Sequence, residues 1–189
     1  AYTTYTTLHD RAYSGVQHLL NVKTIFTGVS AHPTGFLDMS KLHRAQKEFV
    51  EAHNDFQQVQ YTLDHAAIVS TITEYLPQYR PQVTAAHATS KIGIDVTDIG
   101  QELVKTAMTL APTFRGPLLN DTHAPLITPA MLTLARSTID YILPRLSDIQ
   151  AQSATFSFNS LPVSQRQRDQ LTQLIQAMPQ AETDLMQVR

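Results

Sequence analysis

Apolar residues recur at steps of three and four along most of this chain, in five segments. That spacing puts them on one side of an α-helix. The sequence therefore predicts an all-α protein, an elongated antiparallel helical bundle of about five helices that forms a single domain over residues 1–189. The expected helices cover residues 4–27, 39–75, 81–110, 129–152 and 165–188.

The clearest pattern lies in the second expected helix, where a heptad spacing holds for more than three heptads. The residues that keep this spacing are Leu42, Ala45, Phe49, Ala52, Phe56, Val59, Leu63 and Ala66. A continuous seam of this kind needs a partner helix along its length. We expect the helix to continue to Tyr75 before Leu76–Pro77 ends it, which at 1.5 Å per residue gives a rod of roughly 55 Å.

The other expected helices each carry an apolar side that should face the interior. In the first helix this side consists of Leu8, Ala12, Gly15, Leu19, Val22 and Phe26. In the third helix it consists of Val83, Ala86, Ile92, Val96, Ile99, Leu103, Ala107 and Leu110. In the fourth and fifth helices it consists of Met131, Leu134, Ala135, Ile139, Ile142, Leu146 and Ile149, followed by Leu171, Leu174, Ile175, Met178, Leu185 and Val188.

Local signals mark the helix ends. Gly28 suits a helix stop, and Asp38 suits an N-cap. Thr128 followed by Pro129 combines an N-cap with proline at the first helical position. Ser164 and Gln167 match a capping box. Between these signals, prolines and glycines predict loops over residues 30–37 and 112–127.

Four residues interrupt the expected helices. Gly93 and Gly100 each cost about 1 kcal/mol relative to alanine inside a helix. They fit either a kink or break around Gly93 or a close approach of another helix. Pro144 predicts a bend in the fourth helix, and Pro179 predicts a kink or interruption in the fifth.

Composition narrows the function classes. The net charge is −2, and only 16% of residues are charged. Lysine and arginine are scattered rather than clustered, which argues against nucleic-acid binding. The chain has no cysteine, which excludes thiol catalysis and cysteine-based zinc sites. It opens with Ala1 and has no apolar run long enough to span a membrane, so we expect a processed protein or an excised segment.

Candidate chemistry is sparse in the sequence. None of His9, His18, His43, His53, His65 or His87 has a histidine or carboxylate three or four residues away, and His32 in the first loop also lacks one. These are the offsets that place two metal ligands on one helical face. A site assembled from different helices stays open, but surface or boundary positions are the more frequent role of such histidines.

Three carboxylates share one side of the third expected helix, namely Asp95, Asp98 and Glu102. Paired carboxylates perform acid–base chemistry when burial separates their pKa values. Lys91 and Lys105 flank them at helical distances, so we expect a solvated, salt-bridged face instead.

Two further features of the sequence each have a functional and an ordinary interpretation. Asn120–Thr122 matches a glycosylation acceptor, a triplet that is common by chance. Six aromatic residues could line a ligand pocket, although packing in the core or at its boundary is their more frequent role. They are Tyr5, Tyr13, Tyr61, Tyr75, Tyr79 and Phe114. Local hydrolase, phosphate-binding and zinc-protease motifs are absent from the sequence. We therefore expect no enzyme activity and no catalytic, cofactor-binding or metal-binding residue.

The order of segments resembles a known family. The strings at 18–23, 42–63, 75–77 and 91–100 together are similar to the helical region that precedes the domain of unknown function 4012 in membrane proteins of actinobacteria and Chloroflexi. That family has no established activity, so no functional residue carries over. The resemblance implies an extracytoplasmic location and anchoring to the cytoplasmic membrane through a tether outside this chain.

Two functional hypotheses follow. The heptad seam favours a structural or interaction module, a spacer or docking bundle of a bacterial cell-envelope protein. Its partners would be other domains of the same protein or other envelope proteins. The alternative is a sensory bundle that binds a small molecule between its helices, at the irregularities near Gly93, Gly100, Pro144 and Pro179.

Overall fold

The computed structural model describes residues 2–28, 33–114, 127–161 and 164–188. This part of the chain holds six α-helices and no strand. The helices are α1 (Tyr2–Ile25), α2 (Met39–His65), α3 (Ala67–Tyr75), α4 (Arg80–Phe114), α5 (Pro129–Ser153) and α6 (Gln165–Val188), with short 3-10 helices η2 (Pro33–Leu37), η3 (Pro77–Tyr79) and η5 (Phe158–Ser160). The prediction of an all-α bundle is confirmed.

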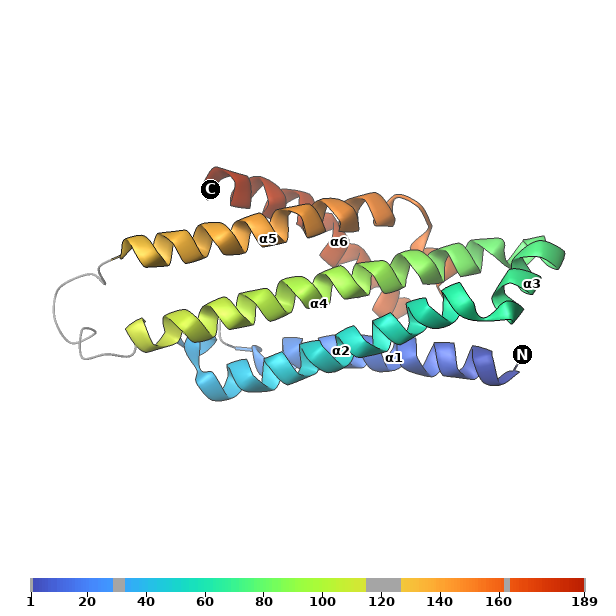
Figure 1. Ribbon diagram of the computed structural model, residues 1–189, viewed down its shortest axis with the longest axis horizontal. Coiled ribbons are helices and arrows are strands. Elements are labelled where there is room, and N and C mark those ends of the chain that lie inside the picture. The colour runs from blue at the N-terminus through green and yellow to red at the C-terminus, as the bar shows by residue number, and fades with distance from the viewer. Residues whose placement is uncertain (1, 29–32, 115–126, 162–163, 189) are drawn as a thin grey trace.

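Figure 1 shows an elongated body in which α1, α2, α4 and α5 lie lengthwise and alternate in direction. The central rod is α4, with α2 along one side and α5 along the other. Helix α1 packs on α2, and α6 packs on α5. The short helix α3 turns at the end of the bundle where α1 begins. Because α4 is shared, the molecule consists of two helical groups, α1–α2–α4 and α4–α5–α6, on either side of one helix.

The helix ends follow the local signals in the sequence. The Asp38 carboxylate accepts hydrogen bonds from the backbone N–H groups of Ser40 (2.8 Å) and Lys41 (3.1 Å) and so caps α2. The Thr128 hydroxyl accepts from the Met131 N–H at 3.2 Å. Gly28 has a φ of +80°, the left-handed conformation that ends many helices. Residues 29–32 of the first predicted loop lie outside the described residues, and its 33–37 part is η2.

The capping box at the start of α6 is also confirmed. The Gln167 N–H donates to the Ser164 hydroxyl at 3.3 Å, and the Ser164 N–H donates to the Gln167 side-chain oxygen at 3.1 Å. These reciprocal bonds satisfy two backbone donors that an uncapped helix end leaves without partners.

The prediction of one unbroken helix from 39 to 75 is wrong, because the chain breaks at Ala66. This residue has extended backbone angles (φ −75°, ψ 114°), although its N–H still bonds the Thr62 carbonyl at 2.9 Å. A new helix starts directly afterwards and buries Val69 with Val59 and Leu63. The break thus turns the apolar side of α3 onto the end of the same core, which a straight rod would not do.

Helix α4 is longer than predicted and runs without interruption from Arg80 to Phe114. The predicted end at Leu110 is therefore wrong, and Pro112 lies in its last turn. The remainder of the predicted loop, including Asn120 and Thr122, lies largely outside the described residues. Helices α5 and α6 likewise run through Pro144 and Pro179.

The heptad seam of α2 is confirmed as the core of the first helical group. All eight of its residues belong to the buried set or pack against it, with Leu42 2% exposed and Phe56 3% exposed. The buried side of α4 was predicted only in part. Ile92, Val96 and Ile99 pack toward α5 and α6, but Leu103 is 49% exposed.

A second stripe on α4 consists of small side chains, and its buried members are Ala85, Ala88, Gly93, Thr97, Gly100, Val104 and Ala111. Cβ atoms placed on Gly93 and Gly100 would meet the rings of Phe56 and Phe49 of α2, so this stripe faces α2. Two buried sides are expected of a helix with neighbours on both sides, whereas a single apolar stripe was predicted. The predictions for Ala135 and Leu174, which are exposed, are also wrong.

Candidate functional site

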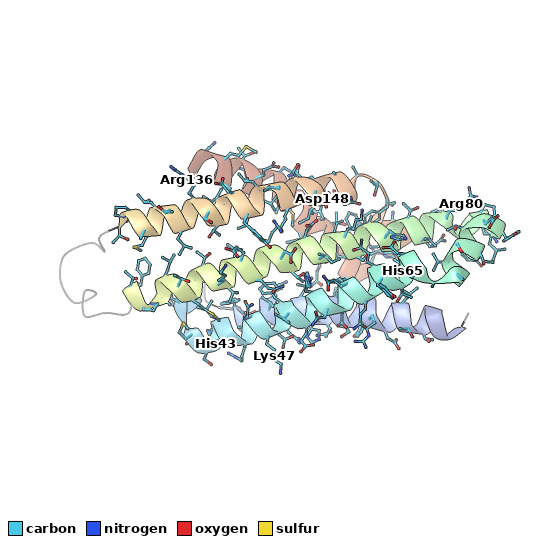
Figure 2. All side chains as sticks on the ribbon, in the orientation of Figure 1. His43, Lys47, His65, Arg80, Arg136 and Asp148 are labelled. Atoms are coloured by element: carbon cyan, nitrogen blue, oxygen red, sulfur yellow. The ribbon has the colours of Figure 1, made fainter. Side chains whose placement is uncertain are left out.

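A groove of about 540 Å³ runs over α4 between α2 and α5. Side chains from all three helices line it, and most of them are polar. They are His43 and Gln46 of α2, Asp98, Gln101, Glu102, Lys105, Met108 and Thr109 of α4, and Tyr141 of α5. Figure 2 labels His43 near the start of α2, which marks the α2 wall of the groove.

The sequence of α4 builds the floor of this groove. Residues 98, 101, 102, 105, 108 and 109 follow one another at helical steps, so their side chains share one side of the helix. That side lies between the stripe facing α2 and the stripe facing α5. Twelve residues at about 1.5 Å each make the floor roughly 18 Å long.

Asp98 is the central charge of the site and joins all three helices. Its carboxylate lies 3.2 Å from Nδ1 of His53 on α2 and 3.5 Å from Nε of Arg145 on α5. Nδ1 of His53 also lies 3.1 Å from the hydroxyl of buried Thr97. These contacts hold α2 and α5 at fixed positions on either side of α4 through one carboxylate.

Arg145 is placed by Tyr141, one turn earlier on α5. Its guanidinium donates to the Tyr141 carbonyl at 2.9 Å, and its Cζ lies 3.5 Å from the centroid of the Tyr141 ring. A cation over a ring face is attracted by the electrons of that face. Burial, with the Asp98 charge as a second cause, raises the pKa of the Tyr141 hydroxyl above its ordinary value, which keeps it neutral.

Asp95 lies one turn before Asp98 and faces Asp148 of α5. Burial raises the pKa of the Asp95 carboxyl from 3.8 to about 7, assisted by a hydrogen bond with Asp148 and by the negative charges of Asp148 and Asp98. The predicted solvated, salt-bridged face is therefore wrong for Asp95 and Asp98, whose described partners lie on α5 and α2. The predicted salt bridge is confirmed for Glu102, which lies 3.5 Å from Lys105, although the Glu102 side chain is only 18% exposed.

Two buried polar atoms at this site have no hydrogen-bond partner in the described part of the chain: Oε1 of Gln46 and Nε of Arg145. A buried oxygen without a donor costs free energy that a bound donor would recover. Nε of Arg145 still has the charge of Asp98 at 3.5 Å. Gln46 thus offers an acceptor in the groove wall to a molecule that carries an N–H or O–H group.

The histidines pair with carboxylates across helix boundaries. His18 lies 2.7 Å from Glu48, and His87 lies 3.5 Å from Asp64, in addition to the contact of His53 with Asp98. These pairs were not predicted, because spacing within one helix does not show which residues of another helix lie opposite. The described residues contain no group of three side chains that could hold a metal ion. His32 and His123 lie outside them.

Four of the six aromatic residues that were considered for a ligand pocket have exposed side chains, and the side chain of Tyr5 lies outside the described part of the chain. Tyr13, Tyr61, Tyr75 and Tyr79 are 55%, 65%, 71% and 48% exposed, so these four side chains are not packed in the core. Tyr61 instead stacks on His65 of the same helix, with the ring centroids 4.2 Å apart. The aromatic residue that lines the groove, Tyr141, was not among those proposed.

The groove combines both signs of charge with neutral donors and acceptors, which suits the binding of a polar segment or molecule.

Comparison of the chain with models of protein families, with curated proteins and with solved structures finds no match. Among the described helices, none is long and apolar enough to cross a lipid bilayer.

Proposed function

We propose that this protein is a non-catalytic spacer or docking module of a bacterial cell-envelope protein. The observation that carries the proposal is the lengthwise packing of α1, α2, α4 and α5 into one elongated body along continuous apolar seams. Such a body keeps a fixed length and presents long helical faces. The charged side chains described above form contacts that join helices, such as those of Asp98 with His53 and Arg145.

The proposed partners are other domains of the same protein or other envelope proteins. The proposed location is outside the cytoplasmic membrane, with attachment through a tether beyond this chain. Both parts of the proposal rest on the resemblance to the helical region that precedes the domain of unknown function 4012.

Photo-crosslinking from single positions tests the docking role. A photoreactive amino acid is placed at Lys47 of α2, Gln101 of the groove, Arg136 of α5 or Gln173 of α6, in the protein expressed in its native cells. A docking module gives the same discrete crosslinked partner from one face and none from the others. Absence of any crosslink from all four faces would contradict docking.

A second function, binding of a small molecule, is favoured by the groove. Its volume of about 540 Å³ falls in the range of ligand sites, and Gln46 presents a buried acceptor that has no hydrogen-bond partner among the described residues. A molecule with amine or hydroxyl donors suits this wall best.

A thermal-shift screen against amines, sugars and amino acids tests this second function. A true ligand raises the melting temperature in a saturable way, because it binds only the folded chain. The Gln101→Trp variant fills the groove and should abolish the rise, whereas Gln57→Trp, at an exposed position of α2, should keep it. A flat response of the native chain across the library, or equal responses of both variants, would contradict a ligand in the groove.

A further inference from the structure

The seam between α4 and α5 brings together more negative than positive charge. Helices α4 and α5 run antiparallel, and Asp98 of α4 lies 3.5 Å from Arg145 of α5. Asp95, three residues before Asp98, therefore lies level with Asp148, three residues after Arg145. Asp95 is partly buried at this seam, and Asp148 is exposed. Figure 2 labels Asp148 near the end of α5. With every carboxyl ionised, three negative charges face the single guanidinium.

The neighbouring helices do not compensate this excess. From α2, His53 reaches the cluster through Asp98 at 3.2 Å. From α6, the Glu182 carboxylate accepts a hydrogen bond from the side chain of Gln150 at 2.5 Å. Gln150 lies within one turn of Asp148 on α5. Lys91 precedes Asp95 by one turn of α4 and is exposed. The guanidinium of Arg145 is already held by Asp98 and by the Tyr141 carbonyl.

Two carboxyl groups that share a hydrogen bond need one proton between them, because two ionised carboxylates repel each other. We propose that the Asp95–Asp148 pair is a proton-operated clamp, which tightens the contact of α5 with α4 in mild acid and loosens it as the pH rises above neutral. Loss of the shared proton loosens the second core, in which Ile92 of α4 packs with Ile142 and Leu146 of α5. It also moves the α5 wall of the groove, because Tyr141 and Arg145 lie on the same helix.

The direction of the pH effect follows from proton binding. In the unfolded chain Asp95 has its ordinary pKa of 3.8, and in the folded protein its pKa is about 7. Between these values the folded protein holds a proton that the unfolded chain has lost, so stability falls as the pH rises. The contribution is complete below pH 3.8 and is lost as the pH passes about 7.

Thermal unfolding at pH 5 and pH 8 tests the clamp. We expect the melting temperature of the native chain to fall by about 2–4 °C over this range, a modest change because the pair is partly solvated. Asp95→Asn supplies a permanent donor to Asp148 and should abolish most of this fall. Asp148→Asn removes the facing charge and should reduce it as well.

Glu51→Gln is the matched control, because Glu51 is an exposed carboxylate on α2 away from this seam. It should keep the pH dependence of the native chain. The proposal is overturned if Asp95→Asn keeps the full pH dependence, or if Glu51→Gln loses as much of it, since the effect would then reflect overall charge. If either aspartate variant fails to fold, the carboxyl ¹³C chemical shift of Asp95 is followed in the native chain as the pH is changed. A transition near pH 7 supports the clamp, and a transition near pH 4 overturns it.

Movement of α5 is measured separately with spin labels. The chain has no cysteine, so labels at Gln57→Cys of α2 and Ser147→Cys of α5 report a single distance. We expect a narrow distribution at pH 5 that broadens at pH 8, and no broadening when Asp95→Asn is added. An identical distribution at both pH values would overturn the proposed loosening of α5.

Discussion

Replacing Phe56 with alanine lowers the free energy of unfolding by about 3–5 kcal/mol, the range for a large aromatic side chain removed from a core. Phe56 is 3% exposed and lies between two helices other than its own. A Cβ atom built on Gly15 of α1 lies 3.0 Å from its ring, and one built on Gly93 of α4 lies 2.5 Å from it. Loss of this ring leaves a cavity where α1, α2 and α4 meet, which denaturant unfolding followed by circular dichroism will measure.

The facing glycine supplies the matched test. Alanine at Gly93 improves helix propensity by about 1 kcal/mol. In the native core, however, its methyl group collides with Cγ of the Phe56 ring, which cannot swing away as a chain tip can. Because overpacking costs about 1–3 kcal/mol, we expect Gly93→Ala to destabilise the native chain.

The sign of this effect should reverse when the ring is removed. In a Phe56→Ala background the methyl group of Gly93→Ala enters the cavity, and the propensity gain remains, so the substitution becomes stabilising. A stabilising effect of Gly93→Ala in the native chain as well would show that the ring does not press on this glycine.

The same pair shows what the sequence determines. The heptad spacing identified Phe56 as a seam residue because a period along one helix is a local property. The caps at Asp38, Thr128 and Ser164 were predictable for the same reason, since the bonded groups lie two or three residues away. Gly93 fitted either a break or close packing, and only the ring of a residue 37 positions earlier decides between them.

The candidate site was hidden because its contacts join distant segments. His18 and Glu48 are separated by 30 residues, and His53 and Asp98 by 45. No spacing rule within one helix finds such pairs. The lysines near Asp95 and Asp98 suggested a solvated face, because the sequence does not show that α5 packs against it. Once α5 lies there, the same carboxylates face Arg145 and Asp148.

The second large effect is expected at the seam between α1 and α2. Asp55 is a buried carboxylate, 4% exposed, and Nη1 of Arg11 donates to it at 2.9 Å. Removing one partner of a buried ion pair leaves an uncompensated charge, which costs about 3–5 kcal/mol. We expect Arg11→Ala to lower the free energy of unfolding by about 3 kcal/mol, near the low end, because Nε2 of His18 remains 3.9 Å from Asp55.

Asp55→Asn distinguishes the buried charge from the packing of the arginine stem. Arg11 is 48% exposed in its side chain, so it regains water when Asp55 is neutralised, and the single variant Asp55→Asn should cost less than Arg11→Ala. Adding Asp55→Asn to Arg11→Ala should then restore part of the lost stability, because an amide is cheaper to bury than an unpaired carboxylate. Strictly additive losses in the double variant would instead mean that Arg11 stabilises α1 through its stem alone, since Asp55→Asn would then cost the same with and without the arginine.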